Sequence, residues 1–148
     1  MIAVVQRCLE SSVEIEGKEY NRIGKGLMVL LGVRKGDTDL NIQKLSQKIL
    51  DLRIFDDEKG VMNLSIKDTG GELLIISQFT LCADNNKSGN RPSYIMAEVP
   101  EKSKPMYEKF LKNISRQYDS EKVKGGIFGA DMKVKLINDG PVTIILER

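Results

Sequence analysis

The sequence predicts a single domain of the α+β class, residues 1–148, with a mainly antiparallel, barrel-like β-sheet and two amphipathic helices packed outside it. About eight short runs rich in aliphatic and β-branched residues alternate with turns, which is typical of strands. Two longer segments instead place their apolar residues at helical spacing. No internal repeat, low-complexity segment or linker divides the chain, so one domain of common size accounts for its 148 residues.

Composition and charge exclude several classes of function. Hydrophobic residues make up 41% of the chain and charged residues 30%, as in an ordinary soluble globular protein. The net charge of +2 is too small to indicate nucleic-acid binding by itself, so any RNA contact has to come from a local patch. The N-terminus has no signal-peptide pattern, and no apolar run approaches the roughly 18–20 residues that span a bilayer. We therefore expect a cytoplasmic protein that does not contact a membrane.

The sequence also limits the chemistry that a site could use. Cys8 and Cys82 are too few and too far apart to indicate a zinc site or a disulfide framework. The chain contains no histidine, which excludes imidazole as a general base and removes the commonest metal ligand. We predict no metal and no cofactor, and expect backbone donors, hydroxyls, carboxylates or the substrate itself to carry any hydrolytic reaction.

The first half of the chain predicts strands and one helix. In order these are strands 2–8, 13–16, 18–23 and 27–33, a helix that begins after residue 37 or 38, and strands 53–55 and 61–64. Arg7 lies among apolar neighbours in the first strand, where it either faces solvent or is buried and donates to carbonyl oxygens. The acidic run at 56–58 precedes Gly60 and indicates a solvated turn rather than a metal or acid–base site, and 68–71 predicts another turn.

Polar residues at the end of a buried strand give the first candidate site. The run 73–76 is wholly apolar, yet Ser77, Gln78 and Thr80 follow it directly. A buried hydroxyl or amide without a partner costs on the order of 1–3 kcal/mol. These side chains are therefore either satisfied by the neighbouring backbone or line a pocket.

The next segments are a loop, a helix and a glycine-rich stretch. The polar loop 84–94 carries Lys87 and Arg91 and is either a surface connection or a functional loop. An apolar stripe predicts a helix over 101–118, with Pro105 in its first turn. The glycines of 123–131 indicate tight bends or close backbone approach.

The second candidate site lies near the C-terminus. Strands are predicted at 133–137 and 142–146, and Asn138-Asp139-Gly140-Pro141 between them predicts a turn. Pro141 removes a backbone donor where the second strand should begin. The tetrapeptide is either a plain turn or a rigid Gly-Pro tip whose carbonyl groups face a ligand.

Several motifs together resemble one enzyme family. MIAVVQRC, GLMVLLGV, LRIFDDEKGVMNLS, SQFTL at 77–81, FGADMKV and NDGPVT at 138–143 are similar to the D-aminoacyl-tRNA deacylases of the D-tyrosyl-tRNA deacylase type. The resemblance runs nearly end to end. It implies hydrolysis of the ester bond of D-aminoacyl-tRNAs, and of mischarged glycyl-tRNA, with rejection of L-aminoacyl substrates as chiral proofreading. The implied partner is the acceptor end of the tRNA, without DNA.

The resemblance also implies roles for the candidate residues. The family is homodimeric with active sites at the interface, where a cis Gly140–Pro141 dipeptide reaches into the partner's pocket and Arg7 orients it. The catalytic segment would be Ser77, Gln78, Phe79 and Thr80, with backbone N–H groups near Phe79 and Thr80 stabilising an oxyanion. Thr80 is the candidate nucleophile, and substrate-assisted hydrolysis by the vicinal ribose hydroxyl is the favoured alternative because no base is evident beside it.

The polar loop departs from the family in part, and two other functions remain open. It keeps Lys87, Gly89, Arg91 and Pro92 of a K-G-x-R-P-like pattern but is longer on its polar side, and we expect Lys87 and Arg91 to contact phosphates. A related family differs at the SQFTL and arginine positions and has a trans Gly-Pro bond, so Arg7, Ser77 and Phe79 favour the D-specific branch.

Two functions other than deacylation remain open. The chain could be a non-catalytic RNA- or DNA-binding module or a dimeric metabolite-binding domain.

Overall fold

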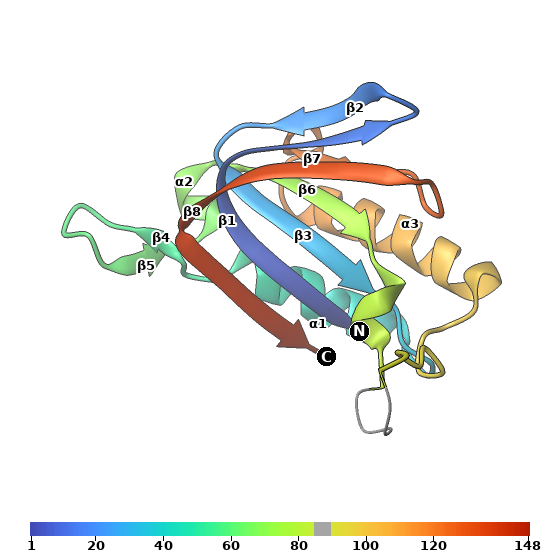
Figure 1. Cartoon of the computed structure of the whole chain (residues 1–148). Coiled ribbons are helices and arrows are strands. Elements are labelled where there is room, and N and C mark those ends of the chain that lie inside the picture. The colour runs from blue at the N-terminus through green and yellow to red at the C-terminus, as the bar shows by residue number, and fades with distance from the viewer. Residues whose placement is uncertain (85–89) are drawn as a thin grey trace.

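The structure is a computed structural model that describes residues 1–84 and 90–148. Its main sheet has the strand order β2-β1-β3-β6-β7, and β8 pairs with the remaining edge of β1 (Figure 1). A separate two-stranded sheet, β4 with β5, projects beyond it. The strands are β1 Ile2–Ile15, β2 Lys18–Ile23, β3 Gly26–Gly32, β4 Phe55–Asp56, β5 Met62–Leu64, β6 Glu72–Ser77, β7 Val123–Gly125 and β8 Met132–Glu147.

The α+β class and the barrel-like sheet are confirmed, but the sheet is mixed. β1 is antiparallel to β2, β3 and β8, whereas β6 runs parallel to both β3 and β7. The parallel pairs follow from the connections, because a helix separates each of these strands from the next and a crossover brings the chain back in the same direction. Close approach at the start of the β3–β6 pair requires glycine, since a Cβ on Gly26 would lie 1.9 Å from the carbonyl oxygen of Glu72.

The sheet curls until its two outer strands meet side by side. The side-chain amide of Asn21 on β2 donates to the carbonyl of Gly125 on β7 at 2.7 Å, and Lys124 Nζ donates to the carbonyl of Arg22 at 2.9 Å. These bonds join β2 to β7 through side chains, so the barrel is nearly closed without a continuous backbone ladder.

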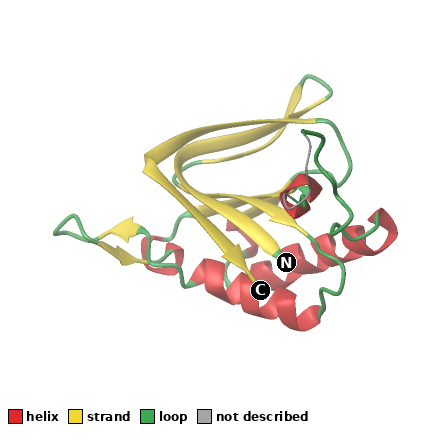
Figure 2. Cartoon of the chain, turned by 60° about the horizontal axis from the view of Figure 1, so that its bottom comes forward, coloured by secondary structure: helices red, strands yellow, loops and turns green. Residues whose placement is uncertain are grey.

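Helices cover one face of the sheet (Figure 2). They are α1 Asp39–Leu50, the short α2 Ile66–Thr69 and α3 Pro100–Gln117, with 3-10 turns η1 Phe79–Cys82 and η2 Ser120–Lys122. Apolar side chains at helical spacing face the sheet from α1 and α3 and form the main core with strand residues: Ile42, Leu45, Ile49, Tyr107, Phe110, Ile114, Ala3, Val5, Leu27, Val29, Leu73 and Ile75. Burying each large aliphatic side chain contributes about 1.5–3 kcal/mol, which fixes the position of the strand ends that carry the site.

Several expected boundaries are wrong. The strands predicted at 2–8 and 13–16 form one strand, because β1 bends and changes partner without ending. The turn predicted at 68–71 begins in α2, which Ser65 caps and Gly70 ends in the left-handed conformation (φ 68°). The helix predicted from 101 begins at Pro100, so Pro105 lies inside it rather than in its first turn.

The C-terminal turn is the largest correction. The strands predicted at 133–137 and 142–146 are two halves of β8, and both pair with β1 in the same direction. Register shifts opposite Arg7 and Leu9 absorb the residues between them. Asn138 to Pro141 therefore form a bend within an edge strand instead of a hairpin turn.

Candidate active site

A pocket lies where β6 ends, beside the start of α3. Its volume is about 580 Å³. Three sequence-predicted residues line it: Ser77, the last residue of β6, and then Gln78 and Phe79. The remaining lining residues are Ile76, Tyr94, Ala97, Glu98, Pro100, Ser103, Phe128, Gly129, Ala130, Asp131, Met132 and Val134.

The chain turns sharply beneath this pocket and leaves two backbone donors. The N–H of Gln78 still continues the sheet, donating to the carbonyl of Leu31 at 2.8 Å, and η1 starts at the next residue. The first N–H groups of a helix have no intrahelical acceptor. Within residues 1–84 and 90–148, no hydrogen bond from the amides of Phe79 or Thr80 is found. These two N–H groups are suited to bind an oxyanion.

Thr80, the fourth predicted residue of this segment, is not among the residues that line the pocket. The side-chain amide of Gln78 donates to Thr80 Oγ1 at 2.7 Å. An amide donor orients the hydroxyl but cannot take its proton, so this contact does not activate Thr80 as a nucleophile. Phe79 is 57% exposed, and its ring meets that of Tyr94 edge-on, with centroids 5.0 Å apart.

The side chains that support the pocket come from α3 and were not predicted as site residues. The hydroxyl of Tyr107 donates to the carbonyl of Ile75 at 2.8 Å and accepts from the N–H of Gly126 at 3.1 Å. Burial raises the pKa of Tyr107 to about 12, so the phenol stays a neutral hydrogen-bond donor. Tyr107 thereby fixes the segment that leads to Phe128. The apolar stripe of α3 predicted Tyr107 only as a core residue.

The charged side chains that line the pocket are both acidic. Glu98 lines the main pocket and also a small adjoining cavity that it shares with Ser77, Gln78 and Phe79. Asp131 also lines the main pocket and pairs with Lys133 at 2.8 Å. Nothing in the sequence distinguished these carboxylates from other surface acids. A pocket with this lining favours a cationic group over a phosphate.

The second candidate site is the bend of β8. The Gly140–Pro141 peptide bond is cis, and Gly140 has φ 131°, a conformation that favours glycine. Both residues are exposed. The side chain of Asn138 closes the bend by accepting the N–H of Val142 at 2.9 Å.

Arg7 is buried beneath this bend, which is the second of its two predicted environments. It is 7% exposed. Its Nε donates to the carbonyl of Asp139 at 3.1 Å and its Nη1 to the carbonyl of Ile54 at 2.8 Å. The carboxylates of Asp139 and Asp56 lie 3.2 and 3.3 Å from the guanidinium. The guanidinium of Arg7 therefore connects β1, β4 and Asp139, the residue directly before Gly140.

A single chain does not bring the two candidate sites together. Arg7 pairs with Leu27 on β3, while Ser77 pairs with Leu31. The offset of four residues corresponds to about 13 Å along the strand, and β8 and β6 lie on opposite sides of the β1–β3 pair. Neither Gly140 nor Pro141 lines the pocket.

The other sequence-predicted residues lie outside this geometry. Lys87 falls outside the described residues, and Arg91 is exposed. Cys8 and Cys82 are buried free thiols; burial raises the pKa of both, that of Cys8 to about 11, so neither is a thiolate near neutral pH. Within residues 1–84 and 90–148, no three His, Cys, Asp or Glu side chains gather to hold a metal ion. No helix in this described part has the length and apolar character to cross a membrane.

Comparison with solved structures identifies the fold first. The structure described as "Structural Analysis of a probable eukaryotic D-amino acid tRNA deacylase" superimposes with a TM-score of 0.81 over 98% of this chain and 97% of that chain, at 16% identity. At that identity the likeness establishes only that the two chains share an α+β fold. A second structure, "c-Myc DNA Unwinding Element Binding Protein", has a TM-score of 0.95 at 42% identity and covers 100% of this chain and 99% of that chain.

Sequence comparison then gives the family. The family described as D-Tyr-tRNA(Tyr) deacylase matches residues 4–147. The D-aminoacyl-tRNA deacylases of Bacteroides thetaiotaomicron and Sulfurihydrogenibium sp. (strain YO3AOP1) are each 55% identical over 147 residues, covering 99% of this chain and 97% of the relative. The chain belongs to the D-Tyr-tRNA(Tyr) deacylase family.

Proposed function

We propose that this protein hydrolyses the ester bond between a D-amino acid and the terminal ribose of a tRNA, releasing the free amino acid and tRNA. The observation that carries the proposal is the pair of N–H groups at Phe79 and Thr80 that have no acceptor in the described residues, where β6 ends at a pocket of about 580 Å³, in a chain of this family. Mischarged glycyl-tRNA, which has no side chain to exclude, is a second substrate under the same proposal.

The reaction needs little from the side chains of the protein. An aminoacyl ester with a vicinal ribose hydroxyl is already activated, so orientation and oxyanion stabilisation supply most of the catalysis. The N–H groups of Phe79 and Thr80 receive the charge that develops on the carbonyl oxygen. The ribose hydroxyl assists the attacking water, because Thr80 has an amide donor beside it rather than a base. Ser77 and Gln78 position the substrate.

The lining of the pocket also suits the other charged group of the substrate. The α-ammonium of the aminoacyl group requires a carboxylate or carbonyl partner. Glu98 lies beside Ser77, Gln78 and Phe79 in both adjoining cavities. We assign Glu98 to the ammonium, which orients the ester for attack.

Selection for the D configuration of the aminoacyl group is proposed to come from the backbone of the bend in β8. If the carbonyl groups of Gly140 and Pro141 face the α-carbon, an L side chain collides with them, whereas a D side chain points toward solvent. Arg7 holds this bend through the carbonyl of Asp139. Main-chain atoms can exclude one configuration without recognising the identity of the side chain, so many D-amino acids are tolerated.

This exclusion of L side chains by the carbonyl groups of Gly140 and Pro141, here called the backbone gate, requires a second copy of the chain. Gly140 and Pro141 are exposed and separated from the pocket of their own chain. β8 pairs only with β1 in the described part of the structure and exposes Ile137 and Ile145, which are 51% and 64% exposed. A long edge strand with apolar side chains favours association. We propose a homodimer in which each bend reaches the pocket of its partner.

Paired hydrolysis assays test the proposed activity. Purified protein is incubated with D-tyrosyl-tRNA and with L-tyrosyl-tRNA under the same conditions, and the release of tyrosine is measured. We expect rapid hydrolysis of the D ester and little above background for the L ester. Equal rates for both esters would eliminate the backbone gate, and no hydrolysis of either would eliminate the activity.

The alternative is nucleic-acid binding without turnover, and the name of the 42%-identical structure, a DNA unwinding element binding protein, is the observation in its favour. This alternative predicts strongly salt-dependent binding of DNA or RNA and no release of amino acid. The hydrolysis assay with D-tyrosyl-tRNA therefore separates the two functions directly.

A further inference from the structure

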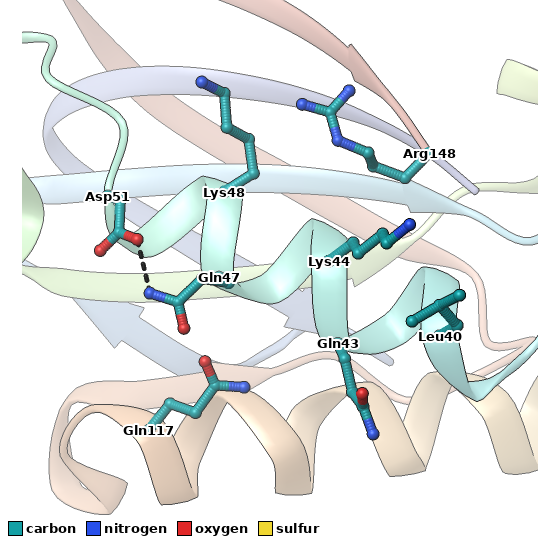
Figure 3. Close-up of a pocket in the computed structure, with 8 residues that line it drawn as sticks. All are labelled: Leu40, Gln43, Lys44, Gln47, Lys48, Asp51, Gln117 and Arg148. Atoms are coloured by element: carbon teal, nitrogen blue, oxygen red, sulfur yellow. Dashed lines mark hydrogen bonds between the residues drawn. The ribbon is translucent and has the colours of Figure 1, made fainter.

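A basic groove lies on the helical layer, apart from the pocket at the end of β6. It runs along the exposed side of α1, between the last turn of α3 and the end of β8, with a volume of about 630 Å³. Figure 3 shows the side chains of Lys44, Lys48 and Arg148 around it, with Gln117 from α3 opposite. Lys44 and Lys48 are exposed and one helical turn apart.

The charge of this groove is not neutralised within the molecule. Within residues 1–84 and 90–148, neither Lys44 nor Lys48 makes an ion pair, and the side chain of Arg148 donates only to the carbonyl of Glu147. The acid of the groove, Asp51, is paired with Lys67 at 2.7 Å. Like charges one turn apart destabilise a helix, so this arrangement is unfavourable for α1 by itself.

One end of the groove, at Arg148, lies at the same end of the sheet as η1, and the groove runs from there along α1 toward Lys48 and Asp51. The thiol of Cys82, the last residue of η1, donates to the carbonyl of Val33 at 3.5 Å. The next residue, Arg34, pairs with Glu147 at 2.8 Å, and Glu147 precedes Arg148. A nucleic acid whose 3′ end enters the pocket beside η1 therefore has this groove within reach of its neighbouring phosphates.

We propose that the groove formed by Lys44, Lys48 and Arg148 binds phosphates of the acceptor arm of the substrate tRNA. This inference rests on the proposed function. Each surface suits the part of the substrate that carries the opposite charge: the acidic pocket suits the α-ammonium, and the basic groove suits the backbone phosphates. Each phosphate contact releases a counterion, and this release raises affinity without reading sequence.

Salt dependence of hydrolysis tests the groove with Lys44→Gln and Lys48→Gln. Each phosphate contact contributes about 0.7–0.9 to the slope of log(kcat/KM) against log[salt], which corresponds to roughly fivefold at 0.15 M salt. We expect each variant to lose about that factor on D-tyrosyl-tRNA and to show the lower slope. D-tyrosyl-adenosine lacks the acceptor-arm phosphates, so its hydrolysis should be unchanged. Lys59→Gln, an exposed lysine between β4 and β5, is the matched control.

Charge reversal separates the proposed contact from a structural role of Lys44. Lys44→Glu places a Glu one turn before Lys48, which is the favourable orientation on a helix. The variant should unfold at a temperature no lower than that of the parent protein and still hydrolyse D-tyrosyl-tRNA more than fivefold more slowly at 0.15 M salt.

Two results overturn the inference while leaving the proposed function intact. One is an unchanged kcat/KM and salt slope for all groove variants on D-tyrosyl-tRNA. The other is an equal loss on D-tyrosyl-adenosine, which would assign these lysines to the pocket or to folding. If the parent protein hydrolyses neither substrate, the proposed function fails and the groove proposal fails with it.

Discussion

Gly140→Ala is expected to displace the bend of β8, because the structure leaves no room for a side chain there. A Cβ would lie 2.7 Å from Val142 Cγ2, 3.0 Å from the backbone nitrogen of Val142 and 3.3 Å from Arg7 Nη2. The φ of 131° is also unfavourable for alanine, at a cost of about 1–3 kcal/mol. Because the bend faces the α-carbon in the proposed site, its displacement also displaces the bound ester, and a shift of about 1 Å can reduce the rate on the order of 100-fold. We expect such a loss on D-tyrosyl-tRNA with the fold retained.

A second variant allows the shared site to be tested by complementation. Ala130→Trp places an indole in the pocket of about 580 Å³ and should block substrate entry. If each bend serves the pocket of the partner, a mixed dimer of the two variants contains one site with both defects and one site with neither. Random exchange makes about half of the dimers mixed, so about a quarter of the parental activity should return.

The assay is hydrolysis of D-tyrosyl-tRNA before and after equal amounts of the two variants are unfolded, mixed and refolded. Each variant treated alone in the same way is the control, and size-exclusion chromatography with light scattering verifies that both are dimers. No recovery of activity from a verified mixed dimer would refute the shared site. Monomeric parent protein that is fully active would refute it as well.

Two further predictions concern single side chains. Glu98→Gln should raise KM for D-tyrosyl-tRNA by about tenfold, because roughly 1.5 kcal/mol of charge-assisted hydrogen bonding to the α-ammonium is lost. KM for the ester of an α-hydroxy acid, which has no ammonium, should be unaffected. Glu101→Gln, on the exposed side of α3, is the control, and equal effects on both esters would contradict the assignment. Cys8 should make stability pH-dependent in alkali. Burial raises its pKa from 9.0 to about 11, so its contribution is complete below pH 9 and about 2–3 kcal/mol is lost as pH rises to 11, because only the unfolded thiol ionises. Urea unfolding of the parent and of Cys8→Ala at pH 7, 9 and 10.5 measures this, and an equal loss in both would exclude Cys8 as the cause.

Local patterns were sufficient for the helices and for part of the lining of the pocket. The helical spacing of apolar residues predicted α1 and α3, because each buries one side against the sheet. Ser77 and Gln78 were identified because polar side chains follow a strand that is otherwise wholly apolar. Their neighbours Glu98 and Tyr107 were missed, because they reach the pocket from 20 or more residues away in the sequence, Glu98 from just before α3 and Tyr107 from within it. Nothing in a surface acid or a core tyrosine signals that contact.

The bend of β8 shows what sequence patterns could not predict. Asn-Asp-Gly-Pro between two apolar runs has the composition of a hairpin turn. Whether the two runs pair with each other or both pair with β1 depends on a partner strand at the start of the chain, more than 115 residues earlier in the sequence. The same distance hides the contact between Arg7 and Asp139, so burial of Arg7 could be stated only as one of two alternatives.

The guanidinium of Arg7 also connects the β4–β5 hairpin, which does not line the pocket, to the bend of β8. Because one side chain donates to the carbonyls of both Ile54 and Asp139, a displacement at the base of the hairpin also moves the bend at Gly140 and Pro141, which is proposed to exclude L-aminoacyl substrates. Loop exchanges between relatives should therefore respect the backbone at 54–56 even where the projecting turn itself is freely variable. Fidelity in this protein would then depend on a segment that touches neither the amino acid nor the RNA.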